Sequence, residues 1–348
     1  MTPYRLIVCL CLLMLPPLAH ARLDVVDLPL PKQPRDLLSF PLVTGEPKAV
    51  ADGINTWLQF RYLEVIADHY KVSPLDQQTP DNHYASFEYT SETDTATVVS
   101  INVRWDYIGG AHGDTGQEDV AFDAHSGRVI GLTDIVSPKG LATLQKKALD
   151  ERVREIDAHI KSLKKGKNPG FSKDDIAEII DIYEKCGDSM AERDLADFVT
   201  YQSTSMNATE FVIAEQCSFA WAIRGWDDIG YMKHTTKFVD FAGYLTPYGR
   251  CVFIDHGSRC TRTEVAEGTY HGTIGRTPIT LVAQRWHGSA YWYEKYNTPI
   301  KLEWPDGRSA TVKLTADNET FDLALQPDGS LKGQWSQPGK PPQPVVLR

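Results

Sequence analysis

The segment that decides the fold runs from Tyr107 to Val136 and reads YIGGAHGDTGQEDVAFDAHSGRVIGLTDIV. Alternating apolar and polar residues lie on both sides of its GGAHG motif (109–113), which indicates two strands joined by a turn. A second turn, DAHSG (Asp123–Gly127), leads into another short strand. The next segment, Leu141–Lys165, repeats apolar residues every three to five positions, which is the spacing of an amphipathic helix. Strands that lead directly into a long helix indicate a mixed α+β domain.

The flanking segments show the same mixture of helix and strand patterns. Ala49–Tyr70 has apolar residues at helical spacing, and His83–Gly110 alternates over two antiparallel strands with a turn near Ser91–Thr95. A further helix is expected after Ser172, because SKDD places a serine N-cap three residues before an acidic residue. Glu210–Ile223 returns to strand-like composition. These patterns predict an N-terminal domain that combines an antiparallel sheet with amphipathic helices.

The composition changes near Ala266, after which the chain consists almost entirely of short alternating segments. Seven or eight such segments follow one another, and two PDG sequences (Pro305–Gly307 and Pro327–Gly329) supply turn signals between them. This spacing is typical of a small antiparallel β-barrel or sandwich. Gly268–Gly275 and Gly329–Ser336 share a G-x-x-x-G pattern, which is typical of strands that bend or approach closely. We expect these first and last strands to be the closing pair.

The first residues predict export from the cytoplasm. Arg5 precedes the apolar run Leu6–Leu15, and PPLAHA (Pro16–Ala21) follows with small residues at the positions of a cleavage site. Residues 1–21 are therefore expected to be a signal peptide that is cleaved after Ala21, which predicts a periplasmic protein. The apolar run has about half of the roughly 20 residues that span a bilayer, so no transmembrane segment is expected after cleavage.

Length and charge set further limits. The 348 residues, less the signal peptide, suggest two domains at roughly 100–200 residues each. We expect an extended, proline-rich lead-in over residues 22–48, an α+β domain over 49–265 and an all-β domain over 266–348. The formal net charge is −10, and −11 once Arg5 is removed with the signal peptide. An acidic chain whose basic run is confined to Lys161–Lys167 argues against a nucleic-acid partner.

Four cysteines follow the signal peptide: Cys186, Cys217, Cys251 and Cys260. An even number in an exported chain predicts two disulfides, for which three pairings exist. We favour Cys251–Cys260, because CVFIDHGSRC can fold back as a hairpin-like loop, and Cys186–Cys217 is then the remaining pair. A metal site would need closely spaced ligand pairs such as C-x-x-C, which the sequence lacks.

The sequence contains no H-E-x-x-H, no G-x-S-x-G and no phosphate-binding loop, which lowers the expectation of an enzyme. The one constellation that invites a chemical reading surrounds the GGAHG motif. A histidine among glycines is most simply a structural residue of the turn, or one that the loop presents to a ligand, since glycines allow close approach. Metal ligation or base catalysis by His112 with Asp114 are the other readings. We expect no metal, no cofactor and no catalytic residue, and the candidate ligand-binding residues are Tyr107, Gly109, Gly110, His112, Gly113, Asp114 and Asp123.

The same stretch resembles a domain of unknown function in bacterial envelope proteins. That domain is the extracellular part of RsiV-type anti-sigma factors, and it also occurs beside the catalytic part of PdaC-type peptidoglycan deacetylases. The resemblance covers about 60 residues and rests on an aromatic residue, G-G-A-H-G, a phenylalanine-aspartate strand, a turn and a leucine-aspartate step into the helix. The matching positions here are Tyr107, Gly109–Gly113, Phe122, Asp123, Ser126, Gly127, Leu132 and Asp134. The resemblance implies a non-catalytic envelope domain, and in RsiV-type receptors this domain recognises lysozyme.

The sequence therefore predicts a periplasmic binding protein that acts at the cell wall. The expected ligand is a lysozyme-like enzyme or a peptidoglycan fragment, and the expected role is that of an inhibitor or a protective, immunity-type factor. One alternative is a peptidoglycan-directed hydrolase that uses His112 with Asp114 or Asp123. Another is a structural module for protein interaction, which an exposed aromatic patch of Tyr291, Trp292, Tyr293 and Trp304 would favour.

Overall fold

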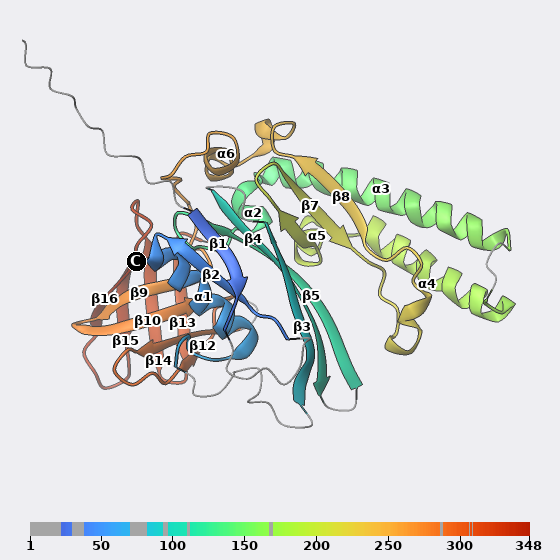
Figure 1. Ribbon diagram of the computed structural model, residues 1–348. Helices are drawn as coiled ribbons and strands as arrows, with labels where there is room; N and C mark the ends of the chain where they lie inside the picture. Colours follow the sequence, from blue (N-terminus) through green and yellow to red (C-terminus); the bar gives the residue numbers. More distant parts are fainter. Residues whose placement is uncertain are drawn as a thin grey trace, which may run out of the picture.

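The computed structural model describes residues 22–29, 38–69, 82–92, 97–109, 112–166, 170–285, 288–305, 307 and 309–348. The expected signal peptide, residues 1–21, lies outside these residues. Figure 1 shows three parts side by side: an eight-stranded sheet formed by the C-terminal strands, a twisted central sheet, and a pair of long antiparallel helices. The fold class is α+β, as the sequence predicts.

The central sheet has the strand order β3-β4-β5 and is antiparallel throughout. Its strands are β3 (Asn82–Glu92), β4 (Val98–Gly109) and β5 (His112–Asp123). Helix α1 (Lys48–Leu63) packs against one face of this sheet, where the rings of Trp57 and Phe122 meet edge to face at 5.4 Å. The sequence predicts both strands of the β4–β5 hairpin and the helix, and the structure contains all three.

The segment expected as an extended lead-in is part of the folded core. Its strands β1 (Arg22–Asp27) and β2 (Pro41–Glu46) form an antiparallel pair. The amide group of Asn55 on α1 bonds the backbone N–H and C=O of Val43 at 2.7 and 2.8 Å, which fixes β2 to the helix. Phe40 is buried against Phe87 of the central sheet, so the lead-in covers the same core as α1.

The third part contains the remaining helices and a small three-stranded sheet of order β6-β7-β8. Helix α4 begins with the capping box of Ser172 and Asp175 that the sequence predicts. The strand-like segment Glu210–Ile223 is shorter than expected, because β7 ends at Glu215 and a 3₁₀ helix begins at Trp221. The elements are α2 (Leu132–Ile135), α3 (Pro138–Lys164), α4 (Lys173–Ala191), α5 (Leu195–Thr200), β6 (Ser203–Met206), β7 (Glu210–Glu215), η1 (Trp221–Trp226), β8 (Met232–Lys237), η2 (Ala242–Tyr244) and α6 (Pro247–Phe253).

The C-terminal strands form one antiparallel sheet of order β12-β11-β10-β9-β16-β15-β14-β13. Two backbone hydrogen bonds between Glu303 and Thr315, at 2.7 and 3.0 Å, join its two ends and nearly close it into a barrel. The strands are β9 (Gly268–Ile274), β10 (Thr277–Ala283), β11 (Ser289–Tyr293), β12 (Ile300–Leu302), β13 (Thr311–Ala316), β14 (Glu319–Leu325), β15 (Leu331–Ser336) and β16 (Gln343–Leu347).

The expected closing pair, Gly268–Gly275 with Gly329–Ser336, is wrong. Strand β16 lies between β9 and β15, because the chain forms one more strand after the last segment that the alternation indicated. The glycines of the shared pattern do mark close approach. A Cβ atom on Gly272 or Gly333 would lie 1.9 or 1.8 Å from a carbonyl oxygen of the neighbouring strand.

The barrel and the first part of the chain share a hydrophobic core. Tyr291 points into the barrel, whereas Trp292 lies on its outer surface and packs 6.1 Å from Phe60 of α1. These residues form no exposed aromatic patch of the kind that would favour a structural module, since Tyr291, Trp292 and Trp304 are all buried and Tyr293 is partly buried. Thr269 on β9 also donates a 2.7 Å hydrogen bond to the carbonyl oxygen of Gly53.

Both favoured disulfides are present, Cys186–Cys217 and Cys251–Cys260. The second does not close a hairpin, because Cys251 belongs to helix α6 and only the residues after Phe253 form the returning loop. Within the described residues, no helix is both long and apolar enough to cross a membrane.

Candidate functional site

The GGAHG motif lies at the end of the β4–β5 hairpin. Gly109 pairs with His112, and Tyr107 pairs with Asp114 two steps further from the end. Gly110 and the side chain of His112 lie outside the described residues. The structure therefore places Tyr107, Gly109, Gly113 and Asp114 together, around the turn that the sequence predicts.

Aromatic side chains support the hairpin just behind this end. The Tyr107 ring meets the Tyr84 ring edge to face at 5.3 Å, and the Tyr84 hydroxyl donates a 2.9 Å hydrogen bond to the carbonyl oxygen of Tyr62. Trp105 lies across Gly116 on the paired strand, and a Cβ atom at position 116 would be 2.1 Å from its ring. Gly116, the second glycine of the GDTG sequence, therefore leaves the space that the Trp105 ring occupies.

A buried ion pair lies next to this aromatic cluster. One guanidinium nitrogen of Arg61 donates to both carboxylate oxygens of Glu118 at 2.7 Å, and the Tyr62 hydroxyl donates to the same carboxylate at 2.9 Å. The Arg61 side chain is only 8% exposed. Burial, together with the Glu118 charge, holds the pKa of Tyr62 well above its usual value. These contacts tie α1 to β5 and hold the base of the hairpin.

Asp123 lies at the other end of β5 and does not belong to the hairpin end. It is 11 residues from His112 along one strand, or roughly 36 Å at about 3.3 Å per residue. Its carboxylate accepts hydrogen bonds from the backbone N–H groups of His125 and Ser126 and from the Tyr248 hydroxyl at 2.9 Å. The structure therefore does not bring Asp123 near His112, and a direct catalytic pairing of these two residues is excluded.

A cleft of about 610 Å³ opens at the Asp123 end of the sheet, where the turn after β5 meets the Cys251–Cys260 loop and the end of the barrel. Sequence reasoning missed this cleft. Four arginines from three separate segments line it: Arg128, Arg259, Arg262 and Arg348. Arg128 is only five residues beyond Asp123, but its position in the cleft depends on barrel residues that are far away in sequence.

Two of these arginines stack on tyrosines, of which Tyr270 lines the cleft. The Arg128 guanidinium lies 3.6 Å from the centre of the Tyr270 ring and donates to the carbonyl oxygen of Thr269. The Arg262 guanidinium lies 4.2 Å from the Tyr248 ring centre, donates to the Tyr248 hydroxyl at 2.6 Å and pairs with Asp134 at 3.2 Å. Such stacked guanidinium groups are fixed in position before any ligand arrives.

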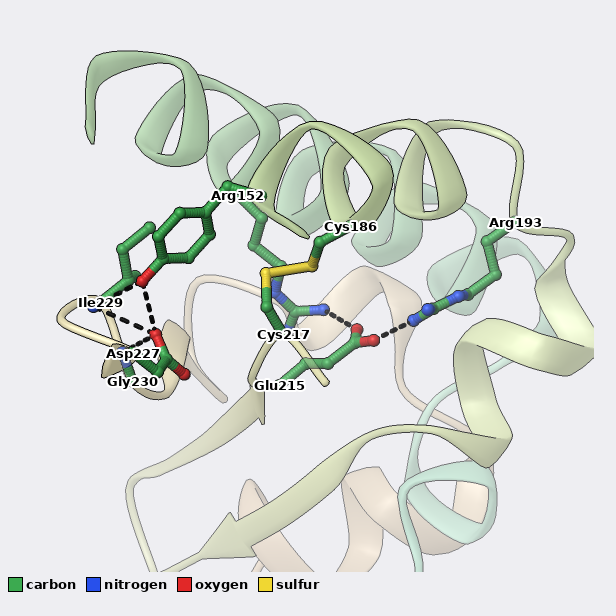
Figure 2. The surroundings of a disulfide bond; sticks show 9 residues. Arg152, Cys186, Arg193, Glu215, Cys217, Asp227, Ile229 and Gly230 are labelled. Atoms are coloured by element: carbon green, nitrogen blue, oxygen red, sulfur yellow. Dashed lines mark hydrogen bonds and ion pairs between the residues drawn. A yellow bond between two sulfur atoms is a disulfide. The ribbon is translucent and has the colours of Figure 1, made fainter. Parts of the chain in front are cut away.

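A second hollow lies beside the Cys186–Cys217 disulfide. Figure 2 shows Glu215 between Arg152 and Arg193, directly below this disulfide. Arg152 donates to Glu215 at 2.9 Å and to Gln202 at 2.7 Å, so the carboxylate is neutralised by two buried cations. The groove above them has a volume of about 1140 Å³. This network holds α3, α4 and β7 together and accounts for the conformation of the groove.

The described residues contain no group of three or more His, Cys, Asp or Glu side chains that would hold a metal ion. All four described cysteines are in disulfides and are not free nucleophiles. These surfaces present exposed hairpin residues at one end of the sheet and arginines at the other.

The comparison with known protein families and curated proteins found no match: the sequence matches no protein-family model, and no curated protein matches it.

Proposed function

We propose that this protein is a non-catalytic binding protein of the periplasm that acts at the cell wall. Its partner is a lysozyme-like enzyme or a peptidoglycan fragment, and binding inhibits that enzyme or protects the cell against it. The observation that carries the proposal is the exposed end of the β4–β5 hairpin, at the described residues that flank the GGAHG turn. Figure 1 shows the far ends of β4 and β5 standing apart from the barrel and from the α3–α4 pair.

The composition of this hairpin end suits contact with a partner. Ile108, next to the motif, is 45% exposed, and Asp114 is exposed on the paired strand. An exposed apolar side chain beside an acid on a well-supported hairpin resembles the apolar centre and polar rim of protein interfaces. The acidic chain, with a net charge of −10, accelerates encounter with a basic enzyme at low salt. Lysozymes are commonly basic.

The two disulfides support the proposed location. Such bonds persist in oxidising compartments, of which the bacterial periplasm is one. The expected signal peptide leads to the same compartment. Secretion of the chain, followed by N-terminal sequencing of the periplasmic form, tests this part, and an N-terminus other than Arg22 contradicts the expected cleavage.

Titration calorimetry of the mature protein against lysozyme and against purified muropeptides tests the function. Heat of binding with either partner is expected. Ile108→Asp should weaken the affinity about tenfold or more, as substitutions of central interface residues do. Asp317→Asn, an exposed acid in the β13–β14 turn, is the matched control and should leave the affinity unchanged. No heat with either partner contradicts the proposal.

A hydrolase is the second candidate function. Because Asp123 lies at the other end of β5, Asp114 is the proposed catalytic partner that remains for His112. Incubation of the protein with peptidoglycan, with and without a chelator, separates it from a binding protein. Release of soluble fragments by the wild-type protein but not by His112→Ala would replace binding with catalysis as the function.

A further inference from the structure

The cleft at the Asp123 end of the central sheet has the features of a ligand site. Its arginines come from the turn after β5 (Arg128), from the disulfide loop (Arg259 and Arg262) and from the residue after β16 (Arg348). Arginines repel one another, so their convergence on one hollow needs compensating negative charge. In Figure 1, α6 and the C-terminus lie towards the same end of the molecule, and residues next to both line the cleft.

The acids of the cleft are already engaged. Asp123 accepts from Tyr248 and two backbone N–H groups, and Asp328 accepts from the backbone and hydroxyl of Ser330 at 3.1 and 2.5 Å. Glu264 has an interaction of its own. By contrast, Arg259 is exposed and makes no hydrogen bond or ion pair with the part of the chain that the structure describes.

The two stacked arginines differ in how well their charge is balanced. Burial alone would lower the pKa of Arg262, but Tyr248, Asp134 and Asp123 outweigh it and raise that pKa. Burial lowers the pKa of Arg128, and the neighbouring Arg262 charge adds to this effect. Asp123 and Tyr270 act in the opposite direction but do not outweigh burial. Within the described residues Arg128 forms no direct ion pair, so an anion beside it would be favourable.

The cleft is also the right size and rigid enough for a small ligand. Its volume of about 610 Å³ lies within the range of roughly 300–1,000 Å³ that is usual for ligand pockets. The Cys251–Cys260 disulfide holds one wall, and the Arg262–Asp134 pair fixes that wall to α2. Guanidinium groups bind carboxylates and phosphates through paired N–H donors, so this wall suits a ligand that carries such an anionic group.

We infer that this cleft binds a small ligand through its carboxylate, with Arg128 as the inner contact and Arg259 and Arg348 at the mouth. The inference rests on the proposed function, from which the class of ligand follows. Of the two peptidoglycan sugars, N-acetylmuramic acid carries a carboxylate and N-acetylglucosamine does not. The cleft therefore selects fragments whose muramic acid has a free carboxylate, that is, fragments without the attached peptide, and the hairpin at the opposite end remains free for a protein partner.

Titration of the full mature protein with matched sugars tests the inference. N-acetylmuramic acid, whose lactyl carboxylate is free, is expected to bind, whereas N-acetylglucosamine is not. The Arg259→Gln/Arg348→Gln variant should weaken binding of N-acetylmuramic acid about tenfold or more, since each substitution removes a charged hydrogen-bond donor. Arg276→Gln, an exposed arginine in the β9–β10 turn, is the control and should bind as the wild type does.

Inorganic phosphate serves as a competitor, because guanidinium groups also bind phosphate. Displacement of N-acetylmuramic acid by phosphate at lower concentration than by acetate would overturn the preference for a carboxylate. Equal binding of the two sugars, or unchanged affinity of the double variant, would overturn the site. Circular dichroism of each variant confirms that the fold is intact, and the exposed positions 259 and 348 make its loss unexpected.

The same variants separate this inference from the proposed function. If the double variant binds lysozyme and peptidoglycan sacculi like the wild type and N-acetylmuramic acid does not bind at all, the cleft assignment fails and the function stands. If N-acetylmuramic acid binds in the cleft but sacculi and lysozyme do not, the cleft assignment stands and the function fails.

Discussion

At the scale of single residues, buried charges lie where distant segments meet. Glu215 on β7 accepts from Arg152 on α3 and from Arg193 after α4, and all three side chains are largely buried. Breaking a buried pair leaves an uncompensated charge in the interior, whereas an exposed pair contributes little. The contribution of each ion pair is thus set by its depth.

Glu215→Gln is expected to lower the free energy of unfolding by about 3–5 kcal/mol, because it leaves two buried arginines without a carboxylate. Chemical denaturation measures this loss. Glu184→Gln removes an exposed ion pair with Lys164 and should cost at most about 1 kcal/mol. Similar losses for the two variants would contradict the assigned role of Glu215.

Gly116→Ala is expected to displace Trp105, since the new Cβ atom would lie 2.1 Å from its ring. Such overpacking typically lowers stability by about 1–3 kcal/mol. Gly113→Ala is the matched change on the same strand, where the nearest atom would be 3.3 Å away, and should cost less. Denaturation and near-ultraviolet circular dichroism follow the two effects, and the reverse order would show that Trp105 is not seated by Gly116.

Tyr84 gives the central sheet a sensitivity to alkali. Burial, with a smaller contribution from Tyr107, raises its pKa to about 12 from the usual 10.0. A raised pKa in the folded state means that this contribution to stability is complete below pH 10 and is lost as the pH rises towards 12. Spectrophotometric titration should show one fewer late-ionising tyrosine in Tyr84→Phe, and an unchanged titration curve would contradict the assignment.

At the scale of elements, the two disulfides close loops of different length. Cys186 and Cys217 are 31 residues apart and join α4 to the segment after β7, whereas Cys251 and Cys260 are only 9 residues apart. In the chain-entropy description, a longer loop restricts the unfolded chain more. The first disulfide should therefore stabilise the fold more than the second.

Replacing both cysteines of each pair by alanine tests this difference. We expect a loss of about 4 kcal/mol for Cys186→Ala/Cys217→Ala and about 2.5 kcal/mol for Cys251→Ala/Cys260→Ala. Denaturation in the absence of reductant compares the two variants directly. A larger loss for the shorter loop would show that native contacts, not chain entropy, dominate.

Local patterns predict most of these elements but not how they come together. The Ser172–Asp175 capping box and the alternation around GGAHG are visible in sequence, because their physical causes lie within a few residues. Strand β16 was missed because prolines surround it in KPPQPVVLR, which weakens the alternating signal. The 3₁₀ helix at Trp221–Trp226 was missed for lack of any periodicity.

The candidate site also has one part that local sequence patterns predict and another that they do not. The hairpin end, with Tyr107, Gly109 and Asp114, follows from the strand–turn–strand pattern. Asp123 was grouped with it because the two are close in sequence, although an extended strand separates them by its whole length. The arginine cleft depends on contacts such as Asp123 with Tyr248, which are 125 residues apart, and no local pattern encodes them.

At the scale of the whole molecule, the barrel and the N-terminal part cannot be separated without opening a core. Val282, Ala290 and Trp292 on the barrel belong to the same buried cluster as Trp57 and Leu58 of α1. Buried apolar contact of this kind couples the unfolding of the parts that share it.

Scanning calorimetry should therefore show one unfolding transition, with equal calorimetric and van 't Hoff enthalpies. Trp292→Ala removes the contact with Phe60 and is expected to lower stability by about 3–5 kcal/mol and to broaden or split the transition. Two resolved transitions in the wild-type protein would contradict this coupling.

The packing of α1 between the central sheet and the barrel also fixes the order in which the chain can mature. Synthesis starts at the N-terminus, so α1 leaves the ribosome long before β10 and β11, on the order of tens of seconds at usual elongation rates. During that interval the side of α1 that carries Phe60 has no cover. Until the barrel strands are synthesised, the growing chain therefore exposes an apolar surface that a chaperone can bind. A truncated chain that ends before the barrel would expose this surface of α1 permanently and should aggregate.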